Sequence, residues 1–186
     1  LIKRGIPVAS AAEYNICEYP EIKRLIEILK YIDCAEQDIP LAASLKSTLG
    51  NCSDEELAKI RLYAGRNESF VGACRLYAEK GNDVLSEKLR SFYTYTQQLR
   101  LLSNVKSAAE LLAKILSDTG MELNELRMEN GGERIKRVNR FLAECGTLNV
   151  TDVLRRLKNN NYEIGFSEAG GENAVKVMTM HASKGL

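Results

Sequence analysis

A short stretch at the C-terminal end, MTMHASKGL, gathers side chains that suit an anionic ligand. Thr179 and Ser183 offer hydroxyl groups, Lys184 offers an ammonium group, and His181 is the only histidine of the chain. Backbone amides beside Gly185, together with these donors, fit the phosphate oxygens of a nucleotide or of a nucleic-acid backbone. The alternative interpretation is a strand-to-helix turn without a function of its own.

Other patterns that could support catalysis are missing from the sequence. The P-loop pattern G-x-x-x-x-G-K-[ST] is absent, so the chain is not expected to hydrolyse ATP by itself. With one histidine and no C-x-x-C pair, no zinc-binding spacing can be assembled, and no cysteine has the partners of a nucleophile. The five cysteines are expected to be small buried hydrophobic residues in a reducing cytoplasm: Cys17, Cys34, Cys52, Cys74 and Cys145.

Two features are typical of nucleic-acid binding but also of ordinary helices. The basic stretches ERIKRVNR, with Arg134 and Arg137, and LRRLKNN, with Arg155, could contact the phosphates of duplex DNA. The alternative for both is a solvated helix face. An aromatic cluster could stack on bases, although its helical neighbours favour a place in the core: Phe92, Tyr93 and Tyr95.

The composition is that of a soluble globular protein without a charge bias. The 186 residues include 26 Lys and Arg against 25 Asp and Glu, so composition alone indicates neither a nucleic-acid nor an anionic-membrane partner. No apolar run is long enough to span a membrane, and no signal peptide is present, which predicts a cytoplasmic protein. Because the first residue is Leu1 and not Met, we expect a fragment of a longer protein.

The spacing of apolar residues is helical over most of the chain. Pro20 lies in the first turn of one expected helix, a further helix opens after Pro40, and Ser53, Ser107 and Thr151 are expected N-caps. The segment 159–173 has the composition of a loop. The expected helices fall within 20–33, 38–47, 52–63, 68–81, 85–103, 107–120, 131–145 and 150–160.

Extended segments are expected only at the two ends. Residues 6–8 form a short extended piece, and AVKVMTM alternates in the manner of a strand. The fold class is therefore mainly α, with short β pieces at both termini. A helical insertion that emerges from an α/β domain would have its entry and exit strands at these places.

The C-terminal stretch VKVMTMHASKGL resembles motif V of the superfamily 1A DNA helicases, the UvrD/PcrA/RecB group. The pattern of that motif is an apolar strand followed by M-T-x-H-x-[AS]-K-G-L, and the matching positions run from Met178 to Leu186. LIKRGIPV at the front is similar to the helix and strand that precede the 2B insertion of the same family. The run from EIKRLIEIL through DIPLAASLKS to SDEELAKIR looks most like the AddA-type helicase–nuclease subunit.

This resemblance implies a division of the chain into three parts. Residues 1–12 would be an edge of a RecA-like domain 2A, residues 13–172 a helical subdomain 2B, and residues 173–186 the return strand into domain 2A with motif V. Thr179 and His181 would contact the DNA backbone, and Lys184 and Gly185 would lie near the connection between DNA and nucleotide. ATP, Mg²⁺ and the nuclease site would be held elsewhere in the parent protein, so the fragment should be inactive alone.

By the same resemblance, the parent would unwind and process DNA ends in recombinational repair. Its partners would be single-stranded and duplex DNA and an AddB-like subunit, with no membrane. Relatives hold duplex phosphates at a Gly-Ile-Gly turn, but here the turn STLGNCSDEEL places three carboxylates after Gly50, which favours a plain capped helix over an anion site. Two alternatives remain: a UvrD/PcrA-type repair helicase without nuclease, and a helical protein–protein interaction domain.

Overall fold

Helices account for most of the structure, a computed structural model that describes residues 8–10, 14–65, 67–166 and 175–177. This confirms the prediction of a mainly helical fold. Within the described part, a 3₁₀ turn, Ile16–Glu18, precedes the α-helices, which are α1 Pro20–Asp33, α2 Asp38–Lys46, α3 Asp54–Ala64, α4 Phe70–Lys80, α5 Val84–Ser103, α6 Ala108–Asp118, α7 Met121–Arg127, α8 Gly131–Cys145 and α9 Val150–Asn159.

Most helix starts lie where the sequence predicts them. Ser53 and Ser107 each accept a backbone N–H from the residue three positions on, where a glutamate bonds back to complete a capping box. Two details differ: α2 begins at Asp38, before Pro40, and Asn149, not Thr151, caps α9. The short helix α7 was not expected, and Gly120, at φ +63°, forms the left-handed turn that separates it from α6.

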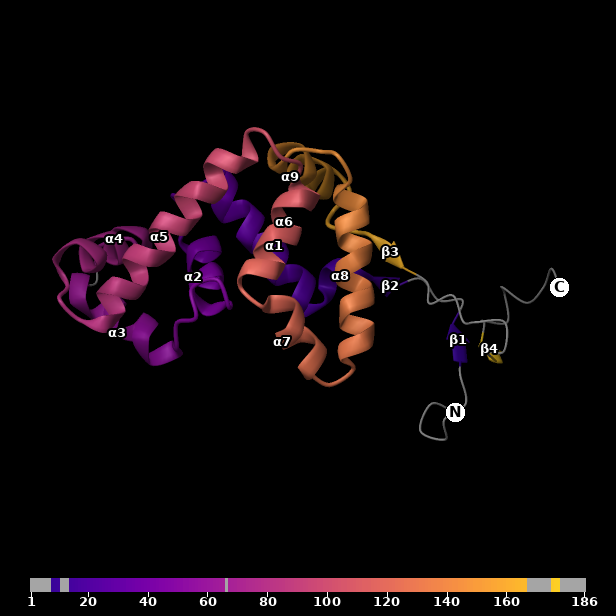
Figure 1. Ribbon diagram of the computed structural model, residues 1–186, viewed down its shortest axis with the longest axis horizontal. Coiled ribbons are helices and arrows are strands. Elements are labelled where there is room, and N and C mark those ends of the chain that lie inside the picture. Colours follow the sequence, from indigo (N-terminus) through magenta and orange to yellow (C-terminus); the bar gives the residue numbers. More distant parts are fainter. Residues whose placement is uncertain (1–7, 11–13, 66, 167–174, 178–186) are drawn as a thin grey trace.

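Two short strands near the ends of the chain pair with each other. β1 (Val8–Ser10) runs parallel to β4 (Val175–Val177), with Val8 opposite Val175. Parallel neighbours need a crossover connection, because the chain must return to the same end of the pair. Here that connection contains every described helix, and Figure 1 shows the pair apart from the helical body, beyond α8 and the β2–β3 pair.

A second strand pair closes the helical body. β2 (Tyr14–Asn15) is antiparallel to β3 (Gly165–Phe166). The prediction of a continuous loop over 159–173 is therefore wrong at the two residues of β3. The Asn15 amide explains the pairing: its nitrogen donates to the carbonyl of Tyr162 at 2.8 Å, and its oxygen accepts the N–H of Ile164 at 3.0 Å. One side chain thus fastens the start of the helical body to its end.

The helical body has two hydrophobic cores. The first lies between α1, α6, α8 and α9 and includes Leu29, Leu112 and Phe141; the second lies among α2, α3, α4 and the first part of α5 and includes Leu41 and Phe92. Burial of each such side chain contributes about 1.5–3 kcal/mol to folding. α1 and α5 contribute to both cores and therefore join the two halves, which Figure 1 shows as α3 and α4 at one end and α6 to α9 toward the other.

Four of the five cysteines lie in the two cores, two in each. Cys17 and Cys145 lie in the first core and Cys52 and Cys74 in the second, which confirms the expectation of small buried hydrophobic residues for these four. Cys34 is half-buried. No helix of the described residues is long and apolar enough to cross a membrane, and the same residues contain no cluster of His, Cys, Asp and Glu suited to a metal ion.

Candidate nucleic-acid interface

Four of the residues expected to contact DNA or couple it to nucleotide lie outside the described residues. These are Thr179, His181, Lys184 and Gly185. The strand that leads to them is described: β4 ends at Val177, one residue before the motif begins at Met178. The prediction that an apolar strand precedes the motif is therefore confirmed for Val175–Val177.

The basic stretch ERIKRVNR is on α8, and its two candidate arginines point into an ion-pair network. Arg137 Nε donates to Glu21 Oε1 at 2.6 Å, and Arg134 Nε donates to Glu125 Oε2 at 2.6 Å. Arg134 also lies 3.3 Å from Glu21 Oε2, and Arg24 donates to Glu125. Three helices, α1, α7 and α8, are thereby joined by two carboxylates and three guanidinium groups.

The charged side chains of this network are buried, so the network serves to hold the helices together. The side chains of Glu21 and Glu125 are only 1% and 4% exposed, and that of Arg137 is 9% exposed and stacks 4.0 Å from the centre of the Tyr19 ring. A buried charge is stable only when paired, and here the partners are already present. The guanidinium groups of Arg134 and Arg137 face the carboxylates of α1 and α7, and a contact of these arginines with DNA phosphates stays a prediction.

Arg155, on α9, is placed differently. Its side chain is 67% exposed and its only ion pair among the described residues is with Asp152, at 3.0 Å on the same helix. Arg155 lines a shallow groove of about 740 Å³ between α9, the end of α1 and the start of α2. Lys158 and Tyr162 line the same groove, and Lys30 lies 5.1 Å from the centre of the Tyr162 ring. Of the three candidate arginines, this one has the exposure that a phosphate contact needs.

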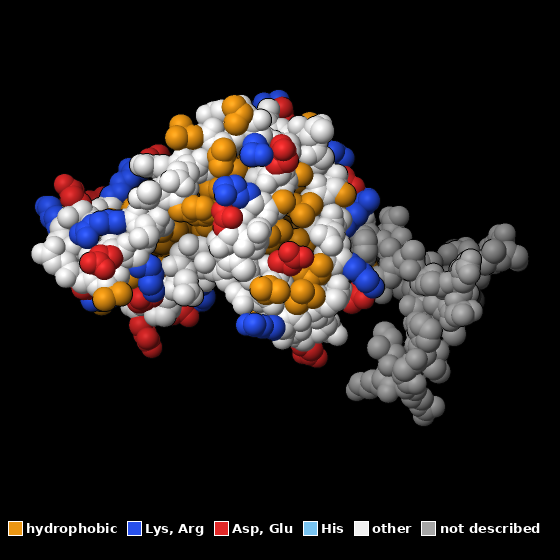
Figure 2. Space-filling view, viewed as in Figure 1, with side chains coloured by type: hydrophobic (Ala, Val, Ile, Leu, Met, Phe, Trp, Pro, Cys, Tyr) orange, Lys and Arg blue, Asp and Glu red, His pale blue; other side chains and the backbone are white. Residues whose placement is uncertain are grey.

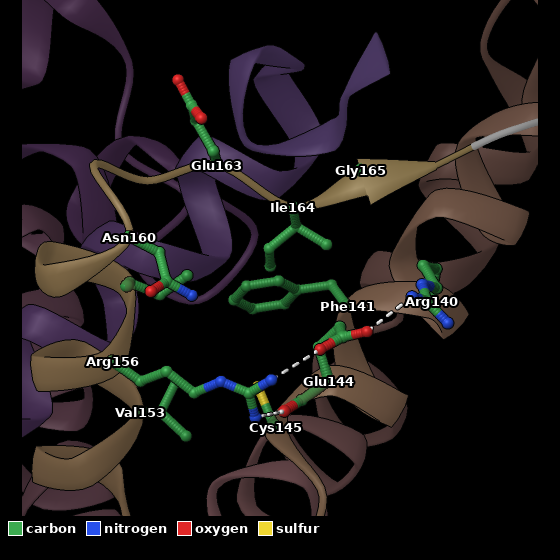
Figure 3. Close-up of a pocket in the computed structure, with 11 residues that line it drawn as sticks. Arg140, Phe141, Glu144, Cys145, Val153, Arg156, Asn160, Glu163, Ile164 and Gly165 are labelled. Carbon is green, nitrogen blue, oxygen red and sulfur yellow. Dashed lines mark hydrogen bonds and ion pairs between the residues drawn. The ribbon is translucent and has the colours of Figure 1, made fainter. Parts of the chain in front are cut away.

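A smaller cavity of about 170 Å³ lies where α8, α9 and β3 meet (Figure 3). Glu144 accepts from Arg140 at 2.6 Å and from Arg156 at 3.1 Å, so both cations at its mouth have a counter-charge. Phe141 and Cys145 form part of its wall, and burial raises the pKa of the Cys145 thiol to about 12. With a neutral thiol and a Glu144 that is paired to two arginines, these residues of the wall offer no activated nucleophile.

The turn before α3 has the features of a capped helix, as the acidic residues predict. The first turn of α3 is closed by the capping box, and two of its three carboxylates pair with lysines: Asp54 with Lys46 at 2.6 Å and Glu56 with Lys88 at 2.7 Å. Gly50 is required for packing, since an added Cβ would lie 2.5 Å from the Cα of Leu45. The glycine therefore has a packing role that is independent of phosphate binding.

Charges of both signs are mixed on the face shown in Figure 2, in keeping with the balanced composition. One cluster of arginines was nevertheless not predicted from the sequence. Arg75, Arg90 and Arg100 line one groove of about 510 Å³ although they belong to two helices. Their spacing along the sequence gives no local signal, and only the packing of α4 against α5 brings them together.

The aromatic cluster is partly in the core, as expected: Phe92 is buried, while Tyr93 and Tyr95 are half-buried.

Comparison with known proteins adds to this geometry. No protein-family profile matches the chain. Curated proteins named as the A subunit of an ATP-dependent helicase/nuclease do match: that of Bacillus velezensis is 32% identical over 199 aligned residues and that of Lactobacillus helveticus 33% identical over 198. The protein of the same name from Clostridium acetobutylicum is 29% identical over 193.

These alignments cover 98–100% of this chain but only 15–16% of the length of each relative. The similarity includes the middle of the chain, where the sequence itself offers only a helical pattern. Over its whole length, this chain is therefore related to one segment of the A subunits of the ATP-dependent helicase/nucleases.

Proposed function

We propose that this chain is the 2B-type accessory region of an AddA-like, ATP-dependent DNA helicase/nuclease subunit. In this proposal residues 13–172 are the helical subdomain, and residues 1–12 and 173–186 are edges of a RecA-like domain 2A. The parent protein unwinds and processes DNA ends in recombinational repair, together with an AddB-like partner. Support comes from the name of the relatives and from the nearly complete coverage of this chain by each alignment.

One observation carries the proposal furthest: β1 and β4 are parallel neighbours although the whole helical body separates them in sequence. Adjacent parallel strands are the building units of α/β sheets. A body inserted between two such strands leaves both strand ends in one sheet, as an insertion into a motor domain requires. The helical interaction domain considered above has no need for paired strands at its two ends.

The proposed DNA contacts follow the strand β4. Thr179 and His181 bind the backbone of single-stranded DNA, and Lys184 and Gly185 connect this contact to the nucleotide site. The sequence contains no P-loop pattern. In this proposal ATP and Mg²⁺ are held by other parts of the parent protein, as is the nuclease site.

The test uses the full-length subunit with its partner. His181→Ala and Thr179→Val each remove one contact to a charged phosphate, a loss of about 1.5–3 kcal/mol. The concentration of single-stranded DNA that gives half-maximal ATP hydrolysis should therefore rise about tenfold or more. Lys114→Ala, which removes a half-buried lysine of α6 and its pair with Asp118, is the matched control and should leave this concentration unchanged.

The two variants should leave basal ATP hydrolysis without DNA intact, because they do not reach the nucleotide directly. An unchanged dependence of ATP hydrolysis on single-stranded DNA in both variants would contradict the assignment of these residues to a DNA contact.

A further inference from the structure

A groove that the proposed function does not use lies where the two halves of the helical body meet. It is formed by the end of α1, by α4 and by α5, and has a volume of about 510 Å³. Arg75 comes from α4, and Arg90 and Arg100 come from the first and second halves of α5. Three guanidinium groups therefore line one open depression.

Two of the arginines are held in place by backbone carbonyls. Arg90 donates through Nε to the carbonyl of Ala78 at 2.7 Å and through Nη2 to that of Gly81 at 2.6 Å. Arg100 donates through Nη2 to the carbonyl of Tyr31 at 3.1 Å and stacks 4.8 Å from the centre of the Tyr31 ring. Carbonyls carry no net charge, so each guanidinium is fixed without being neutralised. A fixed, charged fork is the arrangement that phosphate recognition requires.

Unused hydrogen-bond donors mark the same groove. Arg100 Nε and the hydroxyl of Tyr93 are buried and have no hydrogen-bond partner among the described residues. Burial raises the pKa of Tyr93, with a smaller contribution from neighbouring groups, so the phenol keeps its proton and remains a donor. Buried polar atoms are seldom left unpaired in native proteins.

The charge balance of the groove is positive. Arg75 forms a bidentate pair with Glu36, and Glu79 is the one carboxylate that lines the groove among the described residues. Against these two acids stand three arginines. This differs from the network around Glu21, where the charges are buried and each arginine has a carboxylate.

We propose that this groove binds the phosphodiester backbone of a nucleic-acid strand. Its volume is large for a single phosphate, and its donors come from three helices, which favours a chain of phosphates over one isolated anion. The choice of nucleic acid over an acidic peptide rests on the proposed function. Contacts here engage the backbone and carry no base specificity.

The experiment exploits two adjacent glutamines on α5. Gln97 lines the groove, whereas Gln98 is exposed and does not line it. Gln97→Lys and Gln97→Glu change the charge of the groove without touching a buried residue, and Gln98→Lys and Gln98→Glu make the same changes on another side of the helix. The probe is a fluorescent oligonucleotide of about 20 nucleotides, single-stranded or duplex, in anisotropy titrations of the chain.

At about 50 mM salt, Gln97→Lys should tighten binding about threefold or more and Gln97→Glu should weaken it by a similar factor, while both Gln98 variants should stay within about twofold. Glu79→Gln should also tighten binding. The slope of log affinity against log salt should become less steep by about 0.7–0.9 in Arg100→Gln, which removes one phosphate contact. Arg100→Lys, which keeps the charge, should restore most of that slope.

Three outcomes would overturn the proposal. Equal effects of the Gln97 and Gln98 variants would mean that the affinity depends only on the total charge of the chain. Binding of inorganic phosphate in a calorimetric titration, with no binding of either oligonucleotide, would assign the groove to a free phosphate. Tighter binding of a polyglutamate peptide than of the oligonucleotides, with the same response to Gln97 variants, would assign it to an acidic segment of a protein.

The result is separable from the test of the proposed function. If Gln97→Glu weakens oligonucleotide binding while the Thr179 and His181 variants leave DNA-dependent ATP hydrolysis unchanged, the groove stands and the helicase assignment fails. If the reverse holds, the assignment stands and the groove has no role in binding DNA.

Discussion

The network around Glu21 and the groove around Arg100 each gather three arginines, yet their surroundings differ. In the network, Glu21 and Glu125 are almost fully buried and bond to the guanidinium groups of α8 and α1. In the groove, two arginines are anchored by neutral carbonyls, and donors are left unused. The arginines of the network therefore hold helices together through carboxylates, whereas Arg90 and Arg100 keep an uncompensated charge because their partners are carbonyls.

The largest effect is expected from Glu21→Ala, which breaks the network. The change leaves Arg137 buried beside no carboxylate and removes one of two acids near Arg134. The free energy of unfolding should fall by about 3–5 kcal/mol, measured by urea denaturation followed by circular dichroism. Glu122→Gln, on the exposed side of α7, is the control and should change it by less than about 0.5 kcal/mol. Similar decreases in the free energy of unfolding of both variants would show that the network does not stabilise the fold more than an exposed carboxylate does.

A double variant separates pairing from packing in the same network. Glu21→Leu combined with Arg137→Met removes both charges of one pair and keeps apolar volume. The double variant should be more stable than the sum of the two single changes predicts by about 1–3 kcal/mol, in a double-mutant cycle from denaturation curves. Strict additivity would contradict the direct coupling implied by the 2.6 Å bond between Arg137 Nε and Glu21 Oε1.

The start of α4, the helix that carries Arg75 of the groove, should be sensitive to acid. The carboxylate of Asp38 accepts the N–H groups of Val71 and Phe70 at the start of α4, and these bonds lower its pKa below the usual 3.8. A lowered pKa in the folded state means that the stabilisation is complete above about pH 4 and is lost as pH falls through the folded pKa.

Asp38→Asn should therefore cost about 1 kcal/mol at pH 6, the usual worth of a side-chain oxygen at a helix start, and less at pH 3. Urea denaturation at the two pH values measures the difference. A cost that is equal at both values would show that the charge of Asp38 does not matter for α4, which carries Arg75 of the groove.

The smallest effect is expected from Arg155→Ala. Its exposed pair with Asp152 is worth less than about 0.5 kcal/mol, so the midpoint of urea denaturation should barely move. A loss of more than about 1 kcal/mol would mean that Arg155 belongs with the structural arginines of α8. The variant should instead reduce the salt dependence of oligonucleotide binding if the α9 groove contacts phosphate.

Much of the fold follows from local sequence signals. Capping boxes at Ser53 and Ser107, the proline at the start of α1 and the apolar spacing of each helix are contained within a few residues of one another. Local spacing also predicts the strand β4. By contrast, the β2–β3 pair depends on an asparagine that bonds across the whole body, and no local pattern indicates this.

The site was harder to predict for a related reason. ERIKRVNR has the spacing of a basic helix face, and the partner that neutralises Arg137 lies 116 residues earlier, at Glu21. The groove arginines are the opposite case: Arg75 and Arg90 have no basic cluster around them in the sequence, and their proximity arises from tertiary packing. A charge pattern along one helix therefore does not distinguish an exposed arginine from one that is paired with a carboxylate far away in the sequence.

The distribution of cysteines has a practical consequence. Each hydrophobic core holds two thiols, and burial raises their pKa values to about 11 for Cys17 and Cys52 and about 12 for Cys74 and Cys145. Such thiols react with an alkylating reagent only when their surroundings open. Alkylation rates read peptide by peptide would therefore report separately how often each half of the body opens, with no label introduced. Equal rates in the two halves would mean that α1 and α5 make them open as one unit.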